Sequence, residues 1–404
     1  MIRRAVGLLA LALAGCGSEE TLEADGAIIG GAADTRAHDS VVVVAAREGN
    51  VVRSWCTGTL VAPNLVLTAR HCVSATQGGV TFCTADGASR GGASIAGDLS
   101  PEGLSIFGGA TARPDMTDDE RADAHGREVI AAETTTYCDA DLAFILLDRP
   151  IDLPVAPLRL DAGPRAGEAL TAVGWGLTED GHAASERRRR MVRVDTVGPH
   201  AFDETTRNSE GPRPTRVVSS NACGPAFAST GAVVGIASRS GNGTVERDPS
   251  QPAASCLGER AHGFYTHLAL KQPLVARAFR RAGYTPRDEA AGPGKRTRTR
   301  CSAGADCAGG ACVEGACALR CADGAGCALG QSCEADVGPG ICARAMDTGM
   351  PTAEPVPPPP EPAPAEETSS KEWWACTSGG APARTPGLAL AGLALAAALR
   401  RRRR

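Results

Sequence analysis

The sequence predicts an all-β fold of antiparallel strands for the largest part of this 404-residue chain. Aromatic residues make up only 3% of the chain, whereas 49 glycines and 27 prolines are available for turns, and this composition favours strands over a helical bundle. Short apolar runs, among them residues 41–44, 60–67 and 142–147, recur between turn-forming residues at irregular spacing. This pattern is typical of an antiparallel barrel or sandwich.

One helix is expected to close this domain, which we place at residues 28–284. Five apolar residues near its end would lie broadly on one side of this helix: Leu268, Leu274, Val275, Ala278 and Phe279. The chain is long enough for two or three domains, one of them with a substantial core. The net charge of −4 provides no basic field that would attract nucleic acid.

The first 16 residues have the pattern of a signal peptide, with two arginines followed by an apolar run. Residues 13–16 read LAGC and resemble a lipobox, which implies that Cys16 is lipidated and begins the mature protein. The alternative is an ordinary signal peptide with a cysteine there by chance. Residues 17–27 are interpreted as a propeptide.

Residues 373–404 form a second targeting segment. Cys376, a second candidate lipidation site, precedes an apolar run over residues 386–399, and five arginines end the chain. A helix of this run would be about 21 Å long, short of a bilayer core of about 30 Å. The arrangement resembles the MYXO-CTERM sorting signal of myxobacterial proteins; a plain membrane tether is the alternative. Both place the protein outside the cytoplasm, either anchored at the cell surface or outer membrane or secreted.

A polar linker is expected at 285–300, a cysteine-rich module at 301–342 and a proline-rich stalk at 343–372. The chain has 16 cysteines, which indicates an oxidising compartment. Eight of them lie in the module, which is too small to bury much apolar surface and needs disulfides. Zinc is disfavoured because the module has neither a histidine nor a Cys-x-x-Cys pair. Eight cysteines allow 105 pairings, and the sequence does not choose among them.

Two segments carry the pattern of catalytic residues. Residues 67–72 read LTARHC and hold His71, and residues 141–147 read DLAFILL and begin with Asp141. Both resemble motifs of the chymotrypsin/trypsin-like serine proteases. The resemblance implies two packed antiparallel β-barrels over residues 28–284. It also implies His71 as the general base, Asp141 as the group that orients it, and Ser238 packed against Asp141 beside the substrate cleft.

Further landmarks of the family follow from the same resemblance. Residues 173–176 read VGWG, and residues 28–31 read IIGG, like the mature N-terminus that zymogen cleavage before Ile28 would release. The implied disulfides are Cys56–Cys72, Cys83–Cys138 and Cys223–Cys256. The basic residues 187–190 are expected to be a solvated loop that leads into the strand at 191–194.

The nucleophile segment of the family, Gly-Asp-Ser-Gly-Gly-Pro, is missing. Residues 221–225 read NACGP in its place. In one alignment Cys223 is the cysteine upstream of the nucleophile, five residues are deleted before Gly224, and Asn221 lies at the floor of the specificity pocket. In the other, Asn221 and Ala222 replace the aspartate and serine. Cysteine parity favours the first, because Cys223 can then pair with Cys256.

Both alignments remove the serine and the aspartate that the new N-terminus would bind. Ser219, Ser220 and Ser229 lack the glycine-rich turn expected around a nucleophile. We therefore predict a cell-surface pseudoprotease that binds protein or peptide, with no cofactor or metal and with an undetermined oligomeric state. The alternatives are an active serine endopeptidase, with an unusual nucleophile or a sequence error at the gap, and a surface adhesion module formed by residues 301–342.

Overall fold

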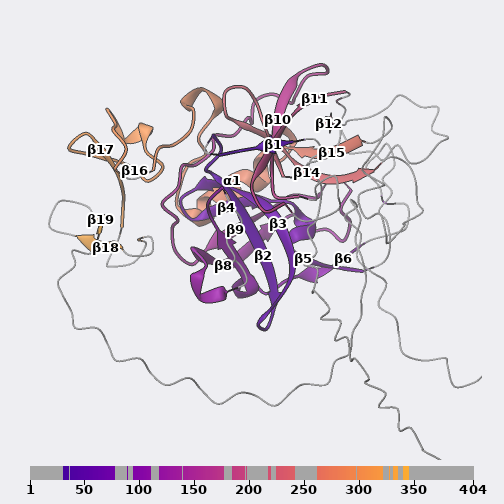
Figure 1. Ribbon diagram of the computed structural model, residues 1–404, viewed down its shortest axis with the longest axis horizontal. Helices are drawn as coiled ribbons and strands as arrows, with labels where there is room; N and C mark the ends of the chain where they lie inside the picture. The colour runs from indigo at the N-terminus through magenta and orange to yellow at the C-terminus, as the bar shows by residue number, and fades with distance from the viewer. Residues whose placement is uncertain are drawn as a thin grey trace, which may run out of the picture.

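The computed structural model describes most of the expected all-β domain and much of the cysteine-rich module (Figure 1). The described residues are 31–35, 37–77, 89, 94–110, 118–138, 140–176, 184–195, 197, 217–219, 224–241, 262–296, 298–321, 327, 331–334 and 340–344. The predicted targeting segments, the propeptide and the stalk from residue 345 lie outside them, as do Cys16, Ile28, Cys83, Asn221, Cys223, Cys256 and Cys376.

The first half of the domain is a closed antiparallel barrel of six strands. Its order is β2 (Val41–Glu48), β3 (Val51–Ala62), β4 (Leu65–Thr68), β9 (Ala143–Leu147), β8 (Ala124–Ala131) and β7 (Leu104–Phe107), which pairs back with β2. The first six residues of β2 and all of β4 and β9 are buried, which explains why these strands read as continuous apolar runs. A separate hairpin joins β5 (Ser74–Gln77) to β6 (Ser94–Asp98).

The second half is a seven-stranded antiparallel sheet. Its order is β1 (Ala32–Ala33), β11 (Arg188–Arg193), β10 (Ala169–Gly174), β13 (Pro225–Phe227), β14 (Val233–Gly241), β15 (His262–His267) and β12 (Val217–Ser219). Over the described residues this sheet has two ends, β1 and β12, so only the first half is a closed barrel. Both halves contribute to one hydrophobic core, in which Trp175, Phe227 and Ile236 pack with the apolar strands of the barrel.

The predicted helix is α1 (Gln272–Ala282), and its buried face includes Val275, Ala278 and Phe279. Pro273 lies in the first turn, where its missing N–H costs no hydrogen bond. Gly283 ends the helix in the left-handed conformation with φ 78°, which a glycine adopts without steric cost. Short 3-10 turns connect other elements: η1 (Arg70–Cys72), η2 (Pro101–Gly103), η3 (Asp119–Arg121), η5 (Leu268–Leu270), η6 (Glu289–Ala291) and η7 (Gly304–Asp306).

The residues after the helix are held against the domain. Val155 and Gly294 exchange backbone hydrogen bonds of 3.0 and 2.9 Å, and the Leu158 amide donates to the Arg287 carbonyl. Arg159 pairs with Glu289 through two hydrogen bonds of 2.7 and 2.8 Å. The polar segment expected as a linker at 285–300 is therefore an ordered connection over most of its length.

The cysteine-rich module consists of two successive units with the same disulfide pattern. The bonds are Cys301–Cys312 and Cys307–Cys317 in the first unit, and Cys321–Cys333 and Cys327–Cys342 in the second. In each unit the first cysteine pairs with the third and the second with the fourth, on a hairpin formed by β16 (Gly310–Val313) and β17 (Ala316–Leu319) or by β18 (Gln331–Glu334) and β19 (Ile341–Arg344). These hairpins lie to one side of the domain in Figure 1. All eight sulfurs are in disulfides, which excludes them as zinc ligands in this state.

Within the described part of the chain, we find no helix whose length and apolar character would allow it to cross a membrane.

Candidate active site

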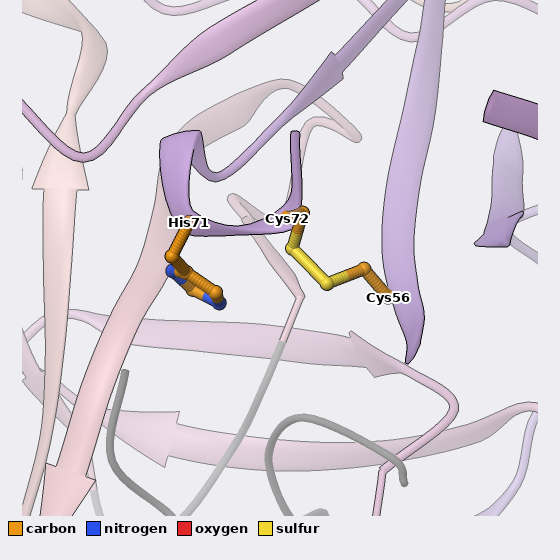
Figure 2. A group of neighbouring side chains, drawn as sticks. All are labelled: Cys56, His71 and Cys72. Atoms are coloured by element: carbon orange, nitrogen blue, oxygen red, sulfur yellow. A yellow bond between two sulfur atoms is a disulfide. The ribbon is translucent and has the colours of Figure 1, made fainter. Parts of the chain in front are cut away.

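His71 lies in the turn η1, directly after the buried strand β4. The neighbouring Cys72 forms a disulfide with Cys56 of β3, so the turn is covalently fixed to the strand that pairs with β4 (Figure 2). The turn therefore holds the imidazole in a defined position at the end of the barrel strand.

Asp141 precedes β9 and is completely buried. One carboxylate oxygen accepts a hydrogen bond from the His71 backbone amide at 2.9 Å. The other accepts from His71 Nδ1 at 2.9 Å and from Ser238 Oγ at 2.6 Å. The structure thus brings together the three residues that the sequence analysis assigned to the base, its orienting acid and the serine beside that acid.

The environment of Asp141 keeps it ionised. Burial by itself raises the pKa of this carboxyl, but attraction to the His71 charge and hydrogen bonds from His71 and Ser238 outweigh burial, so the pKa lies below its ordinary value. Because a carboxylate can only accept, His71 must carry its proton on Nδ1 when it is neutral. That tautomer leaves Nε2 as the basic nitrogen, which is the arrangement a general base requires.

A buried arginine, Arg70, clamps the turn that carries His71. Its guanidinium donates three hydrogen bonds of 2.7 Å each, to Ser74 Oγ, to the Ala132 carbonyl and to the Asp98 carboxylate. No role for this residue was predicted from the sequence. The local signal was an arginine directly before the predicted base His71.

The chain enters β13 at Gly224, where the resemblance would place the end of the nucleophile segment. Gly224 has φ +116°, and a Cβ atom added to it would overlap the carbonyl oxygen of Val173 in β10. Its own carbonyl accepts from the Ala237 amide of β14 at 2.9 Å. Gly224 is therefore packed closely between β10 and β14, and a side chain larger than hydrogen does not fit at the start of β13.

The remaining predicted residues are placed only in part. Asn221 and Cys223 lie outside the described residues, so the two alignments of the gap both remain open. Ser229 lies in an exposed turn beyond the end of β13, and Ser220 lies outside the described residues. Cys138 is disulfide-bonded, whereas Cys83, the partner that the resemblance implies, is outside the described residues.

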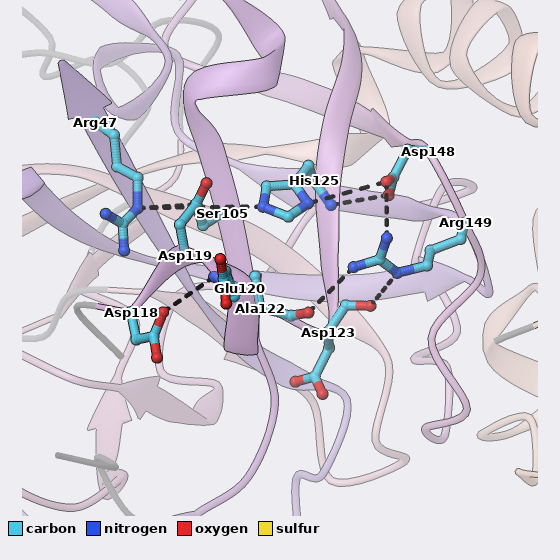
Figure 3. A network of polar contacts seen from close by, with 10 residues as sticks. All are labelled: Arg47, Ser105, Asp118, Asp119, Glu120, Ala122, Asp123, His125, Asp148 and Arg149. Carbon is cyan, nitrogen blue, oxygen red and sulfur yellow. Dashed lines mark hydrogen bonds and ion pairs between the residues drawn. The ribbon is translucent and has the colours of Figure 1, made fainter. Parts of the chain in front are cut away.

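A second polar network lies in the first barrel (Figure 3). The Asp119 carboxylate contacts Arg47, Ser105 and His125, and His125 also lies 3.9 Å from Asp148. Burial raises the pKa of Asp119, but the Ser105 hydrogen bond and the charges of His125 and Arg47 outweigh burial. The pKa of Asp119 therefore lies below its ordinary value. These contacts join β2, β7, η3 and β8, and we assign them a structural role.

Comparison with known proteins agrees with this geometry. Residues 56–236 match the family model described as a trypsin-like peptidase domain. The chain contains a trypsin-like peptidase domain. The matched range includes His71 and Asp141 and the strands on both sides of Gly224. It ends at Ile236, two residues before Ser238.

Solved structures similar to the chain include the inactivated protease paralogue S-D1 of the scabies mite, at 16% identity and a TM-score of 0.40. They also include a mutant of human heparin-binding protein, at 19% identity and a TM-score of 0.42. Each comparison covers 64% of this chain and 100% of the other. No curated protein sequence matches the chain.

The described residues offer no plausible metal centre within the trypsin-like domain. The group Cys56, His71 and Cys72 has donor atoms close together, but both sulfurs are used in the disulfide. Among the described residues of the site, the imidazole of His71 and the carboxylate that orients it supply a general base.

Proposed function

We propose that the trypsin-like domain is a pseudoprotease, which binds protein or peptide segments without cleaving them. The observation that carries this proposal is the pairing of an intact His71–Asp141–Ser238 arrangement with a sequence that has no Gly-Asp-Ser-Gly segment. The base and its orienting acid remain, whereas the atom that would attack a peptide carbonyl is missing.

The chemical deficit is larger than one hydroxyl group. In acyl transfer, backbone N–H groups beside the nucleophile stabilise the negative oxygen of the tetrahedral intermediate. Losing one such donor costs about 2.7–4 kcal/mol, or two to three decades in rate. If residues are deleted before Gly224, those donors are lost with the serine. A serine elsewhere in the chain would supply the nucleophile but not the donors.

The proposal places the protein outside the cytoplasm. Five disulfides over the described residues agree with an oxidising compartment. Anchoring would use the lipid on Cys16, the segment 373–404, or both. The ligand is a protein or peptide, because the frame is that of a peptidase; nucleic acid is not expected.

A fluorophosphonate probe tests the absence of a nucleophile. We expect no labelling of the full-length protein, and no fragments when it is incubated with a mixture of peptides and analysed by mass spectrometry. Labelling of the wild type that disappears in His71→Ala would overturn the proposal and would establish an active serine endopeptidase.

Site-specific photocrosslinking tests the binding half of the proposal. A benzophenone side chain introduced at His71 should crosslink to members of a random peptide library. The same group at Met191, which is 75% exposed on β11, is the matched control and should not enrich the same peptides. Equal crosslinking at both positions would contradict a ligand site beside His71.

A further inference from the structure

A completely buried ion pair joins the N-terminal segment of the domain to the second sheet. Arg187 Nε lies 2.8 Å from Asp34 Oδ2, and neither side chain is exposed. The Arg187 guanidinium also donates to the Val41 carbonyl at 3.3 Å and to the Asp39 carboxylate at 3.0 Å. The expectation that residues 187–190 form a solvated loop is therefore wrong: Arg187 is buried, and the following residues belong to β11.

Backbone contacts continue this attachment on both sides of the ion pair. The Asp34 amide donates to the Arg187 carbonyl at 2.7 Å. Ala32 and Ala33 pair with Arg189 and Arg188 as β1 and β11, and the Arg188 side chain donates to the Gly31 carbonyl. Residues 31–34 are thus held along the edge of the second sheet by main-chain and side-chain groups together.

The same segment reaches the strand that begins at the gap. His38 Nδ1 lies 2.9 Å from Asp34 Oδ1, and the His38 ring lies 4.8 Å from the ring of Phe227, centroid to centroid. Phe227 is the last residue of β13, the strand that follows Gly224. Asp34 therefore contacts both Arg187 and His38, and His38 in turn packs against the end of β13.

We infer that Asp34 and Arg187 are positioning residues that dock residues 31–40 in the uncut chain, so that the arrangement of β13 beside the candidate site does not depend on cleavage between Ala27 and Ile28. The inference rests on the proposed function only in that β13, which pairs with the strand β14 that carries Ser238, is taken as part of the ligand site. Over the described residues, every group in the anchor is a side chain or an internal backbone group, and none of the contacts described above involves the ammonium that cleavage would create.

Electrostatics makes this anchor dependent on both partners. A buried charge whose partner is removed keeps its desolvation penalty and loses the attraction that offsets it. The basic side chains facing Asp34 are Arg187 and His38, with Arg189 Nε more distant at 3.9 Å. The pair thus holds the segment only while Asp34 and Arg187 are both present.

Hydrogen exchange of the uncut and cut forms tests the inference. The full chain would carry an engineered protease site in place of residues 23–27, so that cutting releases Ile28. We expect the amides of residues 31–41 and of β13 to be equally protected before and after the cut. Protection that appears in these amides only after cutting would overturn the inference, because cleavage would then be ordering the segment.

Two variants identify the anchor. Arg187→Met keeps the length of the side chain and removes its charge, and we expect faster exchange over residues 31–41 in both the cut and uncut forms. Arg193→Met is the matched control on an exposed position of the same strand and should leave exchange unchanged. Unchanged exchange in Arg187→Met would refute the role of the ion pair.

If Arg187→Met does not fold, the comparison of cut and uncut wild type still decides the question. The readout uses neither ligand nor catalysis. A wild type that reacts with the fluorophosphonate probe would therefore refute the pseudoprotease while leaving this inference standing, and cleavage-dependent protection would do the reverse.

Discussion

Gly224→Ala should destabilise the trypsin-like domain more than the same change at other glycines with positive φ. The added methyl group would overlap the Val173 carbonyl oxygen and would lie 3.1 Å from Thr57 Cγ2. Val173 cannot move away easily, because β10 is paired with β11 on one side and with β13 on the other. The methyl group can be accommodated only if the start of β13 shifts.

The magnitude follows from two contributions. A sparsely populated backbone conformation costs about 1–3 kcal/mol for a residue other than glycine, and overpacking adds about 1–3 kcal/mol. Gly167 is the matched control, since it has φ +80° and no atom within 4 Å of an added Cβ. Gly167→Ala should show only the backbone contribution, so the two variants should differ by about 1–3 kcal/mol, the overpacking contribution.

Thermal unfolding followed by near-ultraviolet circular dichroism measures this difference. One kcal/mol corresponds to a shift in the midpoint of about 2–4 °C for a domain of this size. Gly224→Ala should therefore unfold at least a few degrees below Gly167→Ala. Equal midpoints would show that Gly224 is not packed closely against β10 and would refute the steric argument.

Three further outcomes are expected. The pKa of Asp141 is lower in the folded state, so this carboxylate stabilises the fold above its unfolded pKa and loses that effect as the pH falls through the folded pKa. Asp141→Asn should therefore weaken the dependence of the urea midpoint on acid pH. An unchanged dependence would contradict the pairing of this carboxylate with His71. Hydrogen bonding and attraction to Arg159 lower the pKa of Glu289 to about 2, so this pair should stabilise the fold above about pH 4.5 and lose its effect as the pH falls toward 2. Glu289→Gln should cost about 1.5–3 kcal/mol at pH 7 in a urea titration, whereas a loss near zero would show that the Arg159–Glu289 pair does not help to dock residues 285–300. Replacing Cys307 and Cys317 together by serine should destabilise the first disulfide unit by about 2–5 kcal/mol. Peptide mapping of the unreduced wild type should detect a disulfide between these two cysteines, and any other partner for Cys307 would contradict the pairing.

The fold class and the orienting pair could be predicted because their signals are local. The buried strands β2, β4 and β9 read as apolar runs, and α1 has a one-sided apolar pattern. His71 and Asp141 each sit in a short motif, although they meet across 70 positions of the chain. The resemblance supplied the pairing that spacing alone does not give.

Other features depend on contacts between distant residues that carry no local signal. Arg187 lies in a run of arginines and reads as solvated, yet its partner Asp34 is 153 positions away and buries it completely. Arg159 and Glu289 are separated by 130 positions, so the docking of the expected linker could not be seen in its polar composition. The disulfide pattern was open for a combinatorial reason, because short spacings permit many pairings.

The two disulfide units also bear on how this chain can change in length. Each unit closes both of its bonds among its own four cysteines and shares none with its neighbour or with the trypsin-like domain. Losing or duplicating a whole unit would therefore leave no unpaired thiol and would not alter the cysteines available to the rest of the chain. The number of units can vary without disturbing oxidative folding upstream, so the spacing between the domain and the segments that follow it is free to diverge by whole units.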